Sequence, residues 1–138
     1  MPDANGRRFE DVEFGDELPE LEPDVSMPKV REFTAAARMQ NSRFNDHEKA
    51  RASGLPGAIV PGIMSQGIMV AQIHAWAPNA RVLKIDTIFR APLLVDSNPR
   101  CRGVVTDLRE DERVAEIDLT MVNEEDETRV MGTALVEL

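Results

Sequence analysis

The second half of the chain alternates between apolar and polar positions. From residue 83 to residue 89, and again from 115 to 121, every second side chain is apolar or uncharged, and most of those between are charged. A period of two residues is typical of a strand buried on one face. Two more apolar stretches that end at polar turns predict further strands. The expected strands cover residues 83–89, 101–108, 115–121 and 129–138, and the polar turns cover residues 109–112 and 123–127.

A stretch of different character precedes these strands. From Gly62 to Trp76 the sequence has no Asp, Glu, Lys or Arg, and its apolar residues fall on most sides of a helix. This pattern predicts a helix that is buried on nearly all sides. Strands with one apolar face each can bury that face when their sheet curls round a helix. We therefore expect an α+β fold in which an antiparallel sheet wraps around a long central helix.

Two shorter helices are predicted upstream of the central one. Ser26 is a favourable cap for the first helix. Asn45 and Glu48 have the spacing of a capping box, which predicts that the second helix opens at Asn45 and ends near Ala52. Gly54 can then terminate this helix in a left-handed conformation.

The most informative motif lies in residues 41–62, which read NSRFNDHEKARASGLPGAIVPG. The segment resembles the active-site segment of the MaoC-like hot-dog hydratases and dehydratases. The family pattern is Asp-x-Asn-Pro-x-His, then x-Asp, a short helix that ends in Ala-Gly-Phe, and a Pro-x-Ile-x-His-Gly turn into a long helix. Asn41, Asp46 and Gly62 match positions of that pattern.

The match to the family is looser elsewhere. Residues 89–96, FRAPLLVD, have an aromatic residue, a proline and an aspartate where the family often has them. Together the two stretches imply a single MaoC-like hot-dog domain over residues 1–138. The resemblance also implies that the ligand is an acyl-CoA or an acyl-carrier-protein thioester.

The family's two catalytic side chains are replaced in this chain. Met39 stands where the family has its acid, and Phe44 stands where it has its histidine. Neither side chain accepts or donates a proton at neutral pH. Sliding the motif along the chain restores no pair of acid and histidine. We expect Met39 and Phe44 to line an apolar wall of the pocket, although both are also ordinary core residues.

Asp46 and His47 are the candidate catalytic replacements for the missing pair. If a helix begins at Asn45, His47 lies near the face that Phe44 approaches, because residues three apart are neighbours on a helix. Adjacent helical residues point about 100° apart, so the acid partner of His47 has to come from elsewhere. The alternative is structural: Asp46 stabilises the helix N-terminus, and His47 is a solvated residue of the first turn.

Other residues of this segment are candidates for binding rather than proton transfer. The resemblance assigns Gly62 to the oxyanion position, where free N–H groups at the helix start hold the thioester oxygen. Asn41 can orient a carbonyl group or a water, and Ser65 and Gln66 can line the same pocket. Each has a structural alternative: a plain helix start for Gly62, a local backbone bond for Asn41, and internal hydrogen bonds for Ser65 and Gln66.

Charge and cysteine content narrow the range of partners. The net charge is −9, with 16 Lys and Arg against 25 Asp and Glu, which argues against binding to nucleic acid or to an anionic membrane. In this acidic chain Arg38 and Arg43 flank Asn41, where either can meet a phosphate or a carboxylate of a ligand. Cys101 is the single cysteine and no secretory signal is evident, so we expect a cytoplasmic protein. No metal-ligand spacing occurs, and no cofactor is expected.

Two functions remain open. The first is an acyl-thioester hydratase or dehydratase, in which His47 and an unidentified acid replace the usual pair. The second is a non-catalytic hot-dog subunit that binds acyl thioesters or supports a catalytic partner. A thioesterase is disfavoured because residues 54–77 contain no Asp or Glu. By family analogy we expect a homodimer, or a heterodimer with a catalytic hot-dog subunit.

Overall fold

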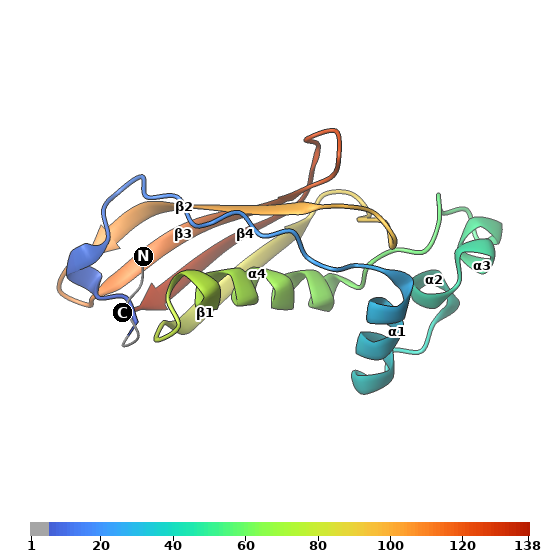
Figure 1. The fold of residues 1–138 in the computed structure, drawn as a ribbon, viewed down its shortest axis with the longest axis horizontal. Coiled ribbons are helices and arrows are strands. Elements are labelled where there is room, and N and C mark those ends of the chain that lie inside the picture. Colours follow the sequence, from blue (N-terminus) through green and yellow to red (C-terminus); the bar gives the residue numbers. More distant parts are fainter. Residues whose placement is uncertain (1–5) are drawn as a thin grey trace.

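The computed structural model describes residues 6–138, in which a four-stranded antiparallel sheet packs against a long helix. Helix α4 (Gly62–Trp76) lies along one face of the sheet (Figure 1). The structure confirms the α+β fold that the sequence predicts, with an antiparallel sheet around a long helix. The strands, whose order across the sheet is β1-β4-β3-β2, are β1 (Arg81–Phe89), β2 (Arg100–Arg109), β3 (Val114–Val122) and β4 (Thr128–Glu137).

The core lies between the sheet and α4. On β3 every second residue from Ala115 to Met121 is buried, as the alternation predicts. From the opposite side α4 contributes Met69 and Trp76, both of which are buried. Gly132 on β4 allows the close approach, because a Cβ atom there would lie 2.9 Å from the Sδ of Met69.

One face of α4 is exposed, which the sequence did not predict. Ile63, Gly67, Ala71 and Ala75 recur every four residues and are exposed, with Ile63 at 54%. The expectation that this helix is buried on nearly all sides is therefore wrong for the isolated chain. Helix faces without charge are normally covered, so this surface is unusual for a protein in water. Within residues 6–138 no helix has the length and hydropathy that a membrane span requires.

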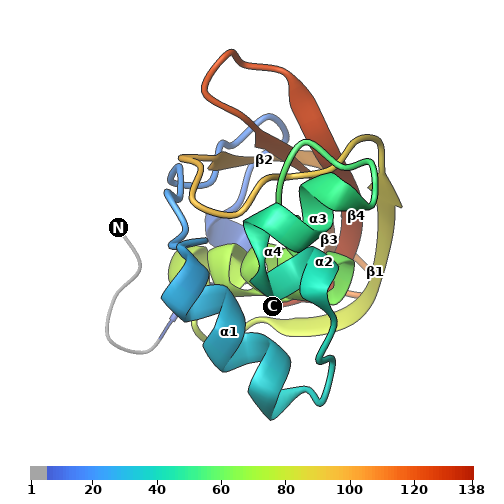
Figure 2. The same ribbon diagram turned by 90° about the vertical axis from the view of Figure 1, so that its right-hand side faces the viewer.

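Three short helices lie beyond the end of the sheet at which α4 begins (Figures 1 and 2). They are α1 (Met27–Ala36), α2 (Ser42–Asn45) and α3 (His47–Ala52). A 3₁₀ turn, η1 (Phe9–Asp11), precedes them in the chain. The small helices and α4 meet at one end of the molecule, and this end contains the pocket described in the next subsection.

The capping of α3 differs from the prediction. Asn45 does not open this helix, because it is the last residue of α2. Asp46 occupies the cap position instead, and its Oδ1 accepts a hydrogen bond from the backbone N–H of Lys49 at 3.0 Å. Gly54 follows α3 with a φ of +100°, the left-handed conformation that the sequence predicts there. Ser26 does precede α1, but its side chain makes no capping hydrogen bond.

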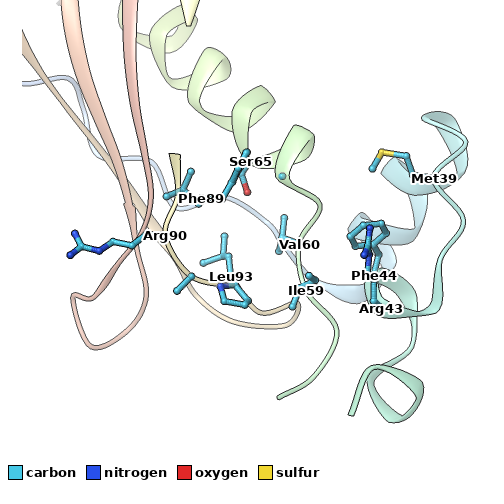
Figure 3. Close-up of a pocket in the computed structure, with 13 residues that line it drawn as sticks. Met39, Arg43, Phe44, Ile59, Val60, Ser65, Phe89, Arg90 and Leu93 are labelled. Atoms are coloured by element: carbon cyan, nitrogen blue, oxygen red, sulfur yellow. The ribbon is translucent and has the colours of Figure 1, made fainter. Parts of the chain in front are cut away.

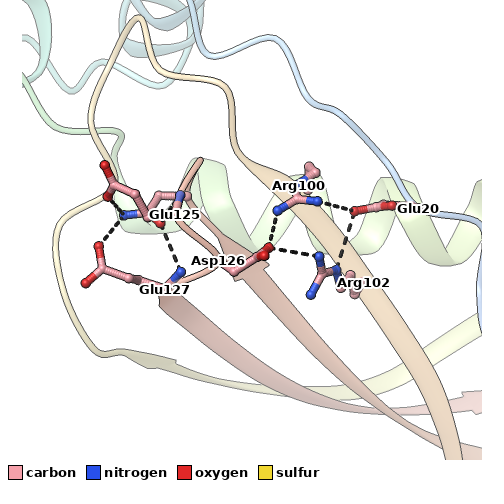
Figure 4. Close-up of polar contacts among 7 residues, drawn as sticks. Glu20, Arg100, Arg102, Glu125, Asp126 and Glu127 are labelled. Atoms are coloured by element: carbon pink, nitrogen blue, oxygen red, sulfur yellow. Dashed lines mark hydrogen bonds and ion pairs between the residues drawn. The ribbon is translucent and has the colours of Figure 1, made fainter.

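A cluster of ion pairs fixes the N-terminal segment over the sheet (Figure 4). The segment makes isolated backbone bridges to β2. Glu20 lies 3.7 Å from Arg100 and 3.4 Å from Arg102, both on β2. The two arginines also contact Asp126 in the turn between β3 and β4. The cluster therefore connects the N-terminal segment, β2 and this turn.

Candidate active site

A pocket of about 480 Å³ lies at the end of the sheet where α4 begins. Figure 3 shows it between the short helices on one side and the end of β1 with its following loop on the other. The lining is mostly apolar, and most of it comes from α2, the segment that enters α4, and residues 89–93. Its apolar part includes Met39, Phe44, Val60 and Leu93.

Backbone hydrogen bonds connect the two sides of this pocket. The N–H of Ile59 donates to the carbonyl oxygen of Arg43 at 2.8 Å, which joins the segment to α2. The N–H of Val60 donates to the carbonyl oxygen of Leu93, also at 2.8 Å, which joins the segment to the loop after β1. The main chain therefore fixes the position of both walls.

The start of α4 supplies hydrogen-bond donors. The first N–H groups of a helix have no partner within it and point out of its N-terminus. Gly62 is the first residue of α4 and lines the pocket. A Cβ atom at Gly62 would lie 2.9 Å from Cζ of Phe89, so the glycine makes room for this ring. Ser65 is one turn further along and also lines the pocket. N–H and hydroxyl donors at this place suit the oxygen of a carbonyl group that gains negative charge.

Among residues 6–138, the pocket lining contains no side chain that titrates near neutral pH. Met39 and Phe44, which stand at the family's acid and histidine positions, both line it. Among the described residues the ionisable side chains of the lining are Arg43 and Arg90, and arginine stays protonated. General acid–base catalysis needs a group that gains and loses a proton near the working pH. The described lining alone does not provide one.

His47 has an acid partner, but the pair is not part of this lining. Nε2 of His47 lies 2.8 Å from Oδ2 of Asp96 in the loop between β1 and β2. Nδ1 of His47 accepts a hydrogen bond from the backbone N–H of Ala58 at 3.0 Å. An accepting Nδ1 places the proton of the neutral imidazole on Nε2, which donates to Asp96. Both ring nitrogens are therefore engaged in contacts within the protein.

Asp96 joins three segments of the chain. One carboxylate oxygen contacts His47, and the other accepts a hydrogen bond from the backbone N–H of Met27 at 2.8 Å. Met27 is the first residue of α1, so Asp96 satisfies a donor that Ser26 leaves without a side-chain cap. The hydrogen bond with His47, followed by that from Met27, holds the pKa of the Asp96 carboxyl below its usual range. The carboxylate thereby holds α1, α3 and its own loop together.

The other sequence candidates make local contacts. Oδ1 of Asn41 accepts a hydrogen bond from the N–H of Arg43 at 2.9 Å and so caps α2. Asp46 caps α3. The side-chain amide of Gln66 donates to the hydroxyl of Thr87 at 2.9 Å. Asn41, Asp46 and Gln66 are not in the lining of this pocket. The sequence candidates that do line it are Met39, Arg43, Phe44, Gly62 and Ser65.

Sequence reasoning did not identify Asp96 or Phe89 as parts of this region. Asp96 is 49 residues from His47 along the chain, and no local pattern connects them. Phe89 was expected only as a residue of a half-buried strand, yet it is 55% exposed and packs against Gly62. The available signal was the looser match to the family over residues 89–96, which begins and ends on these two residues.

Comparison with known proteins identifies the fold. Neither the family models nor the curated proteins give a match to this sequence. The (R)-hydratase from A. caviae involved in PHA biosynthesis matches in structure with a TM-score of 0.86 and 22% identity, over 92% of this chain and 97% of that chain. A MaoC-like dehydratase matches with a TM-score of 0.89 and 23% identity, over 97% of this chain and 43% of that chain.

A third match is a chain of the ChsH1-ChsH2 complex from Mycobacterium tuberculosis, with a TM-score of 0.84 and 20% identity. The match covers 92% of this chain and 98% of that chain. The protein therefore has the hot-dog fold of the MaoC-like hydratases and dehydratases, which the motif in residues 41–62 implied.

Proposed function

We propose that this protein is a divergent MaoC-like hot-dog subunit that binds an acyl thioester, of CoA or of an acyl carrier protein. In this proposal the thioester oxygen is held at the start of α4 by the N–H groups near Gly62 and by the hydroxyl of Ser65. The acyl chain occupies the apolar space beside Phe44, Val60 and Leu93. The subunit binds the thioester but does not hydrate it by itself.

The observation that carries the proposal is the chemistry of the pocket lining. Adding water to an enoyl thioester requires one group that takes a proton from water and one that supplies a proton to carbon. Met39 and Phe44 stand where the family has these groups, and arginine cannot replace them. The donors at the helix start need no change of protonation to bind a carbonyl oxygen. Binding is therefore retained in this proposal, and proton transfer is lost.

A partner chain supplies the missing groups in this proposal. β1 pairs with β4 alone among the described strands, so its other edge has backbone groups without strand partners. Leu83 and Phe89 on β1 are exposed, as is the uncharged face of α4 that includes Ile63. A second hot-dog chain that retains the acid and the histidine would cover this surface. One matching structure, ChsH1-ChsH2, is described as a complex. A homodimer would cover the same surface without adding the pair.

A second candidate function is a hydratase or dehydratase that uses His47. The observation that favours it is the contact of 2.8 Å between His47 and Asp96, since an acid partner is what this function requires. In that mechanism the imidazole has to release the N–H of Ala58 and turn towards the pocket. The cost is an unpaired N–H in a part-buried position, so we rank this candidate second.

Two measurements on the purified protein separate these functions. Calorimetric titration with butyryl-CoA tests binding, and the absorbance of crotonyl-CoA tests hydration. The proposal expects binding without turnover, and hydration only after a hot-dog chain with the full Asp-x-Asn-Pro-x-His motif is co-expressed. Turnover by the chain alone that disappears in His47→Gln, but not in Glu48→Gln, would establish the second candidate. Failure to bind any acyl thioester would reject both.

A further inference from the structure

Arg43 is a cation without an acidic partner in the described part of an acidic chain. Most arginines of this protein contact a carboxylate or a backbone carbonyl oxygen within residues 6–138; Arg100 and Arg102 are examples. No ion pair or side-chain hydrogen bond of Arg43 occurs among those residues, although the net charge of the chain is −9. Its one side-chain contact of note is with an aromatic ring. An unpaired guanidinium in such a chain is informative when it lies at a pocket, as Arg43 does.

The backbone of Arg43 is held from both sides. Its N–H donates to Oδ1 of Asn41 at 2.9 Å, and its carbonyl oxygen accepts the N–H of Ile59 at 2.8 Å. Within Asp-x-Asn-Pro-x-His, Asn41 is the position that this chain retains, and Ile59 belongs to the segment that enters α4. The main-chain position of Arg43 is therefore fixed relative to the pocket wall.

The side chain of Arg43 is supported by Phe44. The guanidinium carbon lies 4.8 Å from the centre of the Phe44 ring, which is the geometry of a cation–π contact (Figure 3). Phe44 itself is 6% exposed and stands at the position of the family's histidine. Phe44, which replaces the family's histidine, therefore supports the guanidinium of Arg43. A guanidinium stacked in this way keeps its N–H groups available at its edge, where they suit carboxylate or phosphate oxygens.

The other arginines near the pocket do not share this arrangement. Arg90 lines the pocket as well, but Figure 3 shows its side chain extending away from the cavity. Arg38 precedes the motif and is exposed, as Arg43 is, but it is not part of the lining. Of the two arginines that flank Asn41 in sequence, the structure therefore brings only Arg43 to the pocket.

We propose that Arg43 binds an oxyanion of the ligand, so that the pocket selects an acyl thioester with a negative group within reach of this wall. The oxyanion is either a carboxylate on the acyl group or a phosphate of the carrier. This inference rests on the proposed binding of acyl thioesters. It specifies in addition that the ligand carries a negative group and that Arg43 binds this group. In this proposal the pocket wall that has Phe44 at the position of the family's histidine binds a negatively charged group of the ligand through Arg43.

Titration of four ligands distinguishes the two sources of the oxyanion. The ligands are butyryl-CoA and glutaryl-CoA, which differ by a carboxylate, and the two corresponding pantetheine thioesters, which lack phosphate. In Arg43→Gln we expect at least an about tenfold loss of affinity, as hydrogen bonds to a charged group are worth about 1.5–3 kcal/mol. A loss confined to the two glutaryl ligands identifies the carboxylate. A loss confined to the two CoA ligands identifies the phosphate.

The control is Arg38→Gln, which removes the same charge nearby but outside the lining, and we expect it to bind all ligands within about twofold of the wild type. Equal losses in Arg38→Gln and Arg43→Gln would overturn the inference, because they would indicate general electrostatic attraction. Wild-type affinity in Arg43→Gln would also overturn the inference. Thermal unfolding of both variants tests that they are folded. If the wild type binds butyryl-CoA but Arg43→Gln changes nothing, only this inference fails. If the wild type binds none of the four ligands, the proposed function fails with it.

Discussion

His47 and Asp96 are 49 residues apart in the sequence, and their side chains meet at 2.8 Å between α3 and the loop that follows β1. The opposite nitrogen of the same imidazole accepts a hydrogen bond from the N–H of Ala58, which directly precedes the pocket-lining residues Ile59 and Val60. The pair therefore supports the segment that lines the pocket, although neither side chain is itself part of the lining. Its arrangement is that of a brace, because each hydrogen-bonding atom of the ring already has a partner within the protein.

Loss of this brace is expected to lower stability. His47→Ala leaves the part-buried N–H of Ala58 and one oxygen of Asp96 without their partner, so we expect the free energy of unfolding to fall by about 1–3 kcal/mol. Urea denaturation followed by circular dichroism measures the change. Glu48→Ala on the same helix is the control, since it is exposed and a surface change of this kind alters stability by less than about 0.5 kcal/mol. Equal effects of the two substitutions would refute a bracing role.

Asp96 is expected to make stability depend on pH in the acid range. Hydrogen bonds with His47 and Met27 lower its pKa in the folded state from the ordinary value of 3.8. The carboxylate therefore contributes its full stabilisation above about pH 4, and this contribution disappears as the pH falls through the lower folded value. The difference in unfolding free energy between wild type and Asp96→Asn should be largest at neutral pH and shrink below pH 4.

Urea titrations at a series of pH values test this dependence. Glu10, whose hydrogen bond with Arg113 lowers its pKa to about 2, titrates in the same direction and contributes to the acid sensitivity of both proteins. Because both proteins contain Glu10, its contribution cancels in the comparison. A wild-type advantage over Asp96→Asn that stays constant from pH 6 to pH 3 would contradict the assigned role.

Introducing the family's acid and histidine at positions 39 and 44 is expected to produce hydratase activity. In the double variant Met39→Asp with Phe44→His, the acid and the base return to one wall of a pocket that retains Gly62 and Ser65. We expect crotonyl-CoA hydration to rise at least about a hundredfold over the wild type, the lower range of what general acid–base groups contribute. Each single variant should remain near the wild-type level. A double variant that binds butyryl-CoA and does not hydrate crotonyl-CoA would contradict this prediction, because these two positions would then be insufficient for hydration.

Gly62 and Phe89 are expected to be coupled. In Gly62→Ala the added methyl group would lie 2.9 Å from the Phe89 ring, so the ring has to move. Because Phe89 is 55% exposed and the contact is with the far end of its ring, the ring can move aside, and we expect a destabilisation of about 1 kcal/mol or less, the low end for overpacking. In Gly62→Ala combined with Phe89→Ala the methyl group finds space, so the loss should be smaller than the sum of the single effects. Additive losses in this double-mutant cycle would contradict the packing described.

The sequence predicted the sheet well because its signals are local. On β3 the alternate residues Ala115, Ile117, Leu119 and Met121 face the core, so a period of two is sufficient to locate the strand. The same logic failed for the exposed face of α4. Composition alone does not reveal which uncharged residues of a helix are covered by other parts of the protein. Gly67 and Ala71 are exposed, although they are as uncharged as the buried Met69.

At the pocket, prediction succeeded in part. Met39, Phe44, Gly62 and Ser65 lie round one pocket because they belong to one motif with a fixed order along the chain. The partner of His47 was beyond reach, because pairing with Asp96 depends on where the β1–β2 loop lies in space. The cap of α3 is Asp46 rather than Asn45 for a simpler reason. Both residue types are good caps, but Asn45 is the last residue of α2 and so is not available to cap α3.

The small helices α1, α2 and α3 lie beyond the sheet, outside the layer in which α4 packs on the strands (Figures 1 and 2). Of the two replaced positions, Phe44 is in α2 and Met39 is in the segment between α1 and α2. The chemistry of this pocket wall is therefore determined by segments outside the sheet, and a substitution at either position changes it without altering any residue of the four strands or of α4.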